Sequence, residues 1–233
     1  MKSYNKRIVC ILCVIVFLNI QFASAEDIQK TVVGDTLIFG SYEQDNNPEN
    51  GPERIEWVVL EIKEDSAQLI SKYGLDTQQF HQKPYREHWK RVVWEDSDIR
   101  KWLNNDFYNK AFTSEEKEQI LKTVVRNGLT KYSKIEGGSD TDDYVFLLSI
   151  EEAENLFVGN KERVCFATPY ATAQGAWTEY DKTCWWWLRS PGEPLEYAAH
   201  IFVNGEIHIY GNRLSGPGGS VRPSIWIRLH ETD

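Results

Sequence analysis

The chain has 233 residues, a formal net charge of −9 and 41% hydrophobic side chains, with nine tryptophans among them. The acidic balance excludes nucleic acid and anionic membrane surfaces as partners, because both require a basic footprint. The length supports one domain with a sizeable core, and no repeat or flexible linker divides it.

The N-terminus predicts export. Three basic residues precede an apolar run from Ile8 to Ile20, and Ala23-Ser-Ala25 fits the small-x-small rule for signal peptidase. We expect a signal peptide over residues 1–25 and a single mature domain over 26–233 that is secreted or displayed at the cell surface, without stable membrane insertion after cleavage. The alternative is an uncleaved anchor, although about 13 apolar residues are few for a bilayer. Cleavage leaves 23 basic against 35 acidic residues.

Strands dominate the first part of the mature chain. The β-rich runs Thr31–Phe39, Ile55–Ile62 and Ala67–Lys72 predict strands, and the last two form a hairpin. Between the first two runs, the loop Asp45–Glu53 is rich in oxygen-bearing side chains, but its spacing departs from an EF-hand calcium loop. A solvated loop is favoured there, and calcium binding stays open. Residues 73–94 show no period and are expected to be irregular.

Helices are expected in the middle of the chain. Asp96 or Ser97 can cap a helix with an apolar stripe, which is interpreted as core packing and not as a cofactor site. The stripe consists of Ile99, Trp102, Leu103 and Phe107. Residues 126–143 are polar and predict a mobile surface loop, and Tyr144–Leu148 predicts a short strand.

Two capping boxes predict further helices. Thr113 with Glu116 and Ser149 with Glu152 have the spacing at which side chains and backbone amides cap each other. The first helix is expected to bury Ile120, Leu121 and Val124, and the second Ala153, Leu156 and Phe157. Strands and helices do not alternate regularly, which favours a mixed α+β domain with a small antiparallel sheet, about three helices and long loops.

Two cysteines remain in the mature chain, Cys165 and Cys184. In an exported protein such a pair first predicts a disulfide, here closing a loop of about twenty residues. Two buried free thiols are the alternative. A catalytic role is less favoured, and a zinc site lacks the usual ligand spacing. We expect neither a metal nor a cofactor.

The stretch Cys184–Gly192 holds three adjacent tryptophans, Trp185 to Trp187. In a strand Trp185 and Trp187 share one face with Arg189, and Trp186 occupies the other. A strand with large rings on both faces is typically covered on both, so this strand is expected at the centre of the core.

An Asn204-Gly205 pair predicts a two-residue hairpin turn. This register pairs His200 with Ile209 and Ile201 with His208, so the two histidines would lie on opposite faces and could not hold one metal. His200 is expected among apolar neighbours, and His208 is expected to be exposed.

The glycine-rich loop Gly211–Ser220 follows the hairpin. Its glycines would allow a ligand to approach the backbone closely, or would simply form a tight crossover. Arg189 and Arg222 either face this surface or hold the strands in place. The candidate ligand-binding residues are Arg189, His208, Tyr210, Asn212, Arg213, Ser215 and Arg222.

The sequence contains none of the common enzyme motifs: no zinc helix, Walker loop, nucleophile elbow or dinucleotide fingerprint. A pair of carboxylates acting on a glycosidic bond would need no such motif, so a hydrolase stays open.

The chain resembles a family of exported or surface bacterial domains of unknown function. The resemblance rests on Trp185-Trp-Trp-Leu-Arg-Ser-Pro-Gly192 and Val221-Arg-Pro-Ser-Ile-Trp226, together with shorter stretches such as Phe39–Tyr42 and Arg100–Tyr108. More remotely, this family is similar to the C-type-lectin-like fold of formylglycine-generating enzymes and of variable proteins diversified by retroelements. The resemblance implies a compact α+β domain with a ligand surface near the C-terminal strands. The two cysteines do not match the motif of the enzymes, and the Trp-Asn-Asp motif of calcium-dependent lectins is absent.

We therefore expect a secreted or surface-exposed binding module for a glycan or a surface protein, and an enzyme is less favoured. The alternatives are an extracellular hydrolase with a carboxylate pair and a purely structural domain. The structural alternative requires every tryptophan to be buried.

Overall fold

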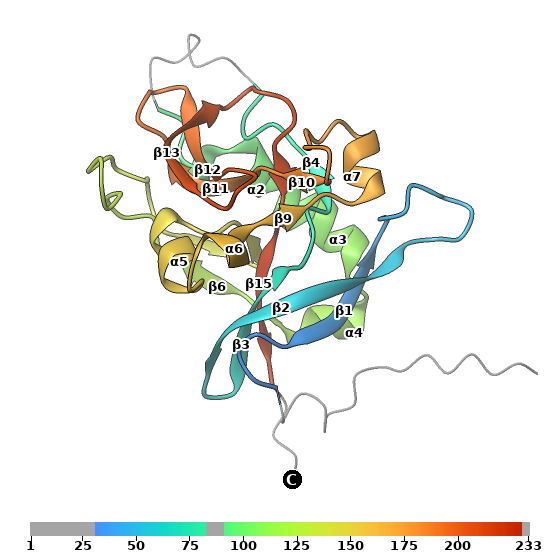
Figure 1. Ribbon diagram of the computed structural model, residues 1–233. Helices are drawn as coiled ribbons and strands as arrows, with labels where there is room; N and C mark the ends of the chain where they lie inside the picture. The colour runs from blue at the N-terminus through green and yellow to red at the C-terminus, as the bar shows by residue number, and fades with distance from the viewer. Residues whose placement is uncertain (1–30, 83–90, 230–233) are drawn as a thin grey trace, which may run out of the picture.

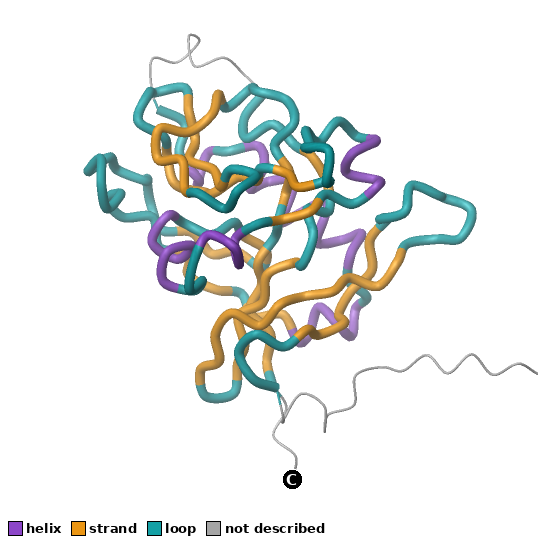
Figure 2. The backbone as a smooth tube through the Cα atoms, in the orientation of Figure 1, coloured by secondary structure: helices purple, strands orange, loops and turns teal. Residues whose placement is uncertain are grey.

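The computed structural model describes residues 31–82 and 91–229. These residues form two mainly antiparallel sheets with short helices around them (Figures 1 and 2). The predicted signal peptide lies outside the described residues. Within the described ranges, no helix combines the length and the apolar character needed to cross a membrane.

The first sheet has the order β1-β2-β3-β15-β5, and β8 also pairs with β15. The strands are β1 (Thr36–Tyr42), β2 (Glu53–Lys63), β3 (Ser66–Ser71), β5 (Ile120–Leu121), β8 (Val145–Phe146) and β15 (Ser224–Arg228). The predicted hairpin of β2 and β3 is confirmed. The first predicted strand begins only at Thr36, because the backbone turns at Gly34, where φ is +96°.

The second sheet has the order β13-β12-β11-β14-β4. Its strands are β4 (Asp76–Thr77), β11 (Trp186–Pro191), β12 (Tyr197–Ile201), β13 (Ile207–Arg213) and β14 (Ser220–Val221). Two small ladders complete the β-structure: β6 (Thr123–Val125) with β7 (Thr141–Asp143), and β9 (Cys165–Phe166) with β10 (Thr183–Cys184).

The helices are short and lie around the sheets. They are η2 (Trp94–Asp96), α2 (Asp98–Trp102), η3 (Leu103–Phe107), α3 (Tyr108–Ala111), α4 (Ser114–Gln119), α5 (Ile150–Asn155), α6 (Asn160–Arg163) and α7 (Pro169–Ala173). α3 packs against β1, α5 against β11 and α7 against β4. The predicted helix from Ser97 is confirmed, with Ser97 as its N-cap, and a π-helical turn follows in η3.

Both predicted capping boxes are present, at Thr113 and Ser149. The helix after Thr113 nevertheless ends at Gln119, so the prediction that Ile120, Leu121 and Val124 form its buried side is wrong. Ile120 pairs with Ile227 in β5, and Val124 lies exposed in β6. The β-branched run favours strand backbone, and pairing with β15 satisfies the amides that a longer helix would have used.

The segment 126–143 is not simply a surface loop. Its end forms β7, and the carboxylate of Asp143 is fully buried, where it accepts hydrogen bonds from Trp94 Nε1 at 2.8 Å and Arg100 Nε at 2.7 Å. A buried carboxylate needs such partners, and these bonds hold the segment against η2 and α2.

β11 is the central strand, as predicted. The rings of Trp185 and Trp187 are in contact, with centroids 4.7 Å apart, while Trp186 lies under the guanidinium of Arg222, 5.1 Å away. The two faces of the strand therefore carry different tryptophans, and all three are buried. Arg222 lies between β14 in one sheet and β15 in the other, and its Nε donates to Ser71 O of β3. Arg222 thus links the two sheets.

The predicted disulfide between Cys165 and Cys184 is not formed. Cys165 and Cys184 lie directly opposite each other in β9 and β10 as free, buried thiols. Cys184 is hydrogen-bonded to Cys165, and this bond together with burial raises the pKa of Cys184. Burial opposes ionisation of Cys165, but the bond from Cys184 and the nearby charge of Arg222 hold the pKa of Cys165 below its usual value.

The hairpin register is shifted by one residue from the prediction. His200 pairs with His208, and Ile201 pairs with Ile207. Phe202 and Glu206 close a three-residue loop in which only Gly205 has a positive φ, of +81°. A turn of this kind uses the same Asn-Gly signal as a two-residue turn, so the sequence alone does not distinguish them.

Candidate functional site

The structure places the seven predicted ligand residues in two different environments. Arg189 and Arg222 are buried, with 3% exposure each, and hold the strands in place. The other five lie on β13 or just after it, at the surface: His208 and Asn212 half-buried, Tyr210, Arg213 and Ser215 exposed. The structure does not bring the seven together at one site.

Arg189 has no donor left for a ligand. Its guanidinium donates to both carboxylate oxygens of Glu152, to Asn127 Oδ1, and to the backbone carbonyls of Leu147 and Arg126. These five bonds use the five N–H groups that an arginine possesses. The side chain therefore fastens β11 to α5 and to the segment after β6.

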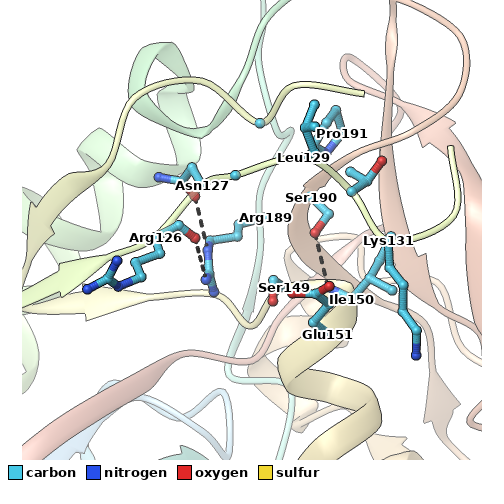
Figure 3. A pocket seen from close by; sticks show the side chains of 13 residues that line it. Arg126, Asn127, Leu129, Lys131, Ser149, Ile150, Glu151, Arg189, Ser190 and Pro191 are labelled. Carbon is cyan, nitrogen blue, oxygen red and sulfur yellow. Dashed lines mark hydrogen bonds between the residues drawn. The ribbon is translucent and has the colours of Figure 1, made fainter. Parts of the chain in front are cut away.

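A hollow of about 200 Å³ lies beside Arg189 (Figure 3). Its polar groups are engaged within the protein: Asn127 accepts from Arg189, Ser190 Oγ accepts from the backbone N–H of Ile150, and Lys131 is paired with Glu154. This volume is below the usual range of ligand pockets. The hollow is therefore a structural junction and a poor candidate for the site.

The glycine-rich loop is packed inward over its second half. A Cβ on Gly219 would lie 2.2 Å from Trp187 Nε1, and one on Gly218 would lie 3.0 Å from the Cβ of Trp177. The glycines permit close packing on tryptophans, which accounts for their presence without a ligand. Only Ser215 and Pro217 of the loop from Leu214 onward are exposed.

A larger groove, of about 420 Å³, is lined by residues that are hydrogen-bonded to this loop and by a helical segment. We call it the amide groove. It is lined by Gln78, Gln79, Gln82, Asp98, Ile99, Lys101, Trp102, Asn105 and Asp106. The glutamines follow β4, and the remaining residues come from α2 and η3.

Hydrogen bonds to the glycine-rich loop position the glutamine wall of the amide groove. The backbone N–H of Gln78 donates to Gly219 O, and Gln79 Nε2 donates to Ser215 O at 2.7 Å. The side chain of Gln78 is in turn hydrogen-bonded to the buried carboxylate of Asp76. Burial raises the pKa of Asp76, and Tyr42 donates to it at 2.6 Å, which is consistent with a structural role behind the groove wall.

The helix wall of the groove supplies charge and an aromatic ring. Trp102 is half-buried, with its ring 5.6 Å from that of Phe107, so part of its surface remains accessible. Asp98 accepts from the backbone N–H of Gln82 and lies 3.1 Å from His81 Nδ1. The carboxylate of Asp106 is exposed and makes no hydrogen bond or ion pair with the described residues.

Sequence reasoning missed this groove. The sequence places Trp102 in a core stripe, but the structure shows that its ring is only half-buried. The glutamines lie in a segment without periodicity. The signal that could have found them is composition, since Gln78, Gln79 and Gln82 place three amide side chains within five residues.

The carboxylates of Glu43, Asp45 and Glu53 converge within 4.8 Å in the loop considered for calcium. Their oxygens already accept bonds from that loop: Glu53 from the N–H groups of Gln44 and Asp45, and Asp45 from Asn47 and Asn50. The carboxylates are therefore clustered because they hold the loop in its conformation.

Several aromatic side chains reach solvent. Trp177 is 47% exposed, and Tyr180 and Tyr210 are exposed as well. A purely structural domain predicts that every tryptophan is buried, whereas Trp177 is exposed.

The described residues thus define an α+β domain of two joined sheets with a polar groove beside the second one. The chain belongs to a family described as a domain of unknown function, DUF6273, which matches residues 64–229. No curated protein and no solved structure matches the chain.

Proposed function

We propose that the chain is a binding module that recognises a glycan through the amide groove. The observation that carries the proposal is the combination of three glutamines, an asparagine, two aspartates and a half-buried tryptophan in one groove of about 420 Å³. This volume lies within the range of small-ligand sites.

The chemistry of the lining suits sugar hydroxyl groups. A hydroxyl both donates and accepts, and an amide side chain offers two donors and an acceptor on one planar group. The side chain of Gln82 makes no hydrogen bond with residues 31–82 and 91–229, and we propose that its amide pairs with a ligand hydroxyl. Asp106 can accept from two neighbouring hydroxyls.

Trp102 supplies the apolar component. One face of a sugar ring carries C–H groups that stack on an aromatic ring, and tryptophan offers the largest such surface. Trp102 comes from α2, whose N-cap Ser97 is buried and whose Ile99 lies in the core, so the ring is presented by a rigid element.

The predicted export signal supports a secreted or surface location, where glycans are accessible. A surface protein is the other partner that the sequence leaves open. We also propose that the fold is C-type-lectin-like. The mainly antiparallel sheets, the short helices and the long loops support this proposal.

A glycan array with the wild-type protein tests the proposal, followed by calorimetry with the selected glycan. Trp102→Ala should weaken binding by about tenfold or more, because a central aromatic anchor is lost. Trp226→Ala is the matched control: Trp226 is also half-buried, but it lies outside the amide groove and under the ammonium of Lys63. A blank array at high protein concentration, or equal weakening by both substitutions, would reject glycan recognition at this groove.

A hydrolase is the second candidate, favoured by one observation. Asp98 and Asp106 line the same groove, and glycosidic hydrolysis needs two carboxyl groups on either side of the scissile bond. If the bound glycan is cleaved, new reducing ends appear in solution, and Asp106→Asn should abolish their release even at glycan concentrations that saturate the variant. If the glycan stays intact after prolonged incubation, the protein binds it without cleaving it.

A further inference from the structure

His200 and His208 form a cross-strand pair that has no role in the proposed glycan groove. They lie directly opposite each other in β12 and β13, and their ring centroids are 4.9 Å apart. The pair exists because the three-residue turn shifts the hairpin register by one residue from a two-residue turn. His200 is buried, with 6% exposure, while His208 is half-buried.

Aromatic rings hold both histidines in place. The ring of Trp185 lies edge-on to His200, with centroids 5.1 Å apart. His208 is stacked on Phe202 at 4.9 Å, with an interplanar angle of 12°. Rings confined in this way have few alternative rotamers, so a site built on them is preorganised.

The Nδ1 atom of His200 is buried without a hydrogen-bond partner. Within residues 31–82 and 91–229, two other buried side-chain atoms share this property, but each has a polar neighbour. His81 Nδ1 lies 3.1 Å from Asp98 Oδ2, and Ser220 faces the thiol of Cys184. A buried polar atom without a partner costs about 1–3 kcal/mol, so His200 Nδ1 calls for an explanation, such as a bound water or ion.

We propose that His200 and His208 bind one transition-metal ion of the Cu²⁺, Ni²⁺ or Zn²⁺ class, with water or a small oxygen ligand at the open positions. Metal–imidazole bonds of about 2.0–2.1 Å place two nitrogens that share an ion at most about 4.2 Å apart. Rings with centroids 4.9 Å apart meet this limit when their nitrogen-bearing edges face the ion.

The chemistry of the pair selects this class of ion. Neutral imidazole suits copper, nickel and zinc, whereas Ca²⁺ and Mg²⁺ prefer oxygen ligands. Imidazole coordinates in its neutral form, which the burial of His200 beside the ring of Trp185 favours. The net charge of −9 favours the approach of a cation. Among the three ions, Cu²⁺ should bind most tightly.

The test uses untagged protein freed of metal with a chelator, titrated with Cu²⁺, Ni²⁺, Zn²⁺ and Ca²⁺ in separate experiments. Calorimetry should show one Cu²⁺ per chain, with weaker Ni²⁺ and Zn²⁺ binding and no Ca²⁺ binding at this site. Bound Cu²⁺ should also quench tryptophan fluorescence, because Trp185 lies next to His200.

Variants assign the site. His208→Gln should weaken Cu²⁺ binding by about tenfold or more, because one of two protein ligands is lost. His81→Gln removes a histidine outside the pair and should bind as the wild type does. His200→Phe should abolish the site, and if that variant does not fold, His208→Gln alone decides. Absence of Cu²⁺ binding by the wild type, or binding that His208→Gln leaves unchanged, would overturn the proposal.

Discussion

Because His200 is buried, we expect the folded protein to lose a calculable part of its stability in acid. The pKa of His200 is lowered from 6.5 to about 4, mainly by burial and to a smaller extent by the neighbouring His208. Because the pKa of the folded state lies below that of the unfolded state, this contribution to stability is complete above pH 6.5 and is lost as the pH falls toward 4. Each pKa unit corresponds to about 1.36 kcal/mol, so the loss is about 2 kcal/mol at pH 5 and about 3 kcal/mol at pH 4.

His200→Phe isolates this contribution, because phenylalanine keeps a ring beside Trp185 and cannot be protonated. Urea unfolding of the metal-free wild type and variant should be followed at several pH values between 4 and 8. Protonation of carboxylates lowers the free energy of unfolding of both proteins in acid, so the prediction concerns the difference between the two free energies. Between pH 8 and pH 5, this difference should change by about 2 kcal/mol in favour of the variant. Parallel pH profiles for the two proteins would refute the reasoning. His208→Phe is the control for loss of a histidine that is only half-buried.

Two further predictions concern the core around β11. Gly219→Ala should destabilise the fold by about 1–3 kcal/mol in chemical denaturation, because its Cβ would lie 2.2 Å from Trp187 Nε1. Gly128→Ala, which meets nothing within 4 Å, is its matched control, and equal effects would contradict the packing argument. Cys165 and Cys184 should both be unreactive toward a thiol reagent in the native protein and both reactive after unfolding without reductant. An intact mass lower by two hydrogen atoms would show that they are bonded instead.

Three helix starts were predicted from the sequence, but the starts of α6 and α7 and the helix ends were not. Ser97, Thr113 and Ser149 all cap helices, because a cap depends on contacts within a few residues. The end of α4 at Gln119 depends instead on the pairing of Ile120 with Ile227, more than a hundred residues away. The β-branched run that begins at Ile120 favours a strand locally, but only this long-range pairing fixes where the helix ends.

The alternation of the tryptophans in β11 was predictable, because strand geometry fixes it. The role of Arg222 was open between ligand contact and strand support. Only the three-dimensional packing shows its guanidinium against Trp186 and hydrogen-bonded to Ser71 of the other sheet. The amide groove was not predictable from periodicity, since Gln78 and Gln82 lie in an irregular segment and Trp102 joins them only through the tertiary fold.

The indole N–H signals of the tryptophans in NMR spectra report whether Trp102 is the contact surface for a glycan. On addition of the glycan selected by the array, we expect a saturable shift of the Trp102 signal and no shift for Trp226. A shift confined to the exposed Trp177, or no shift of any indole signal, would contradict glycan binding at Trp102.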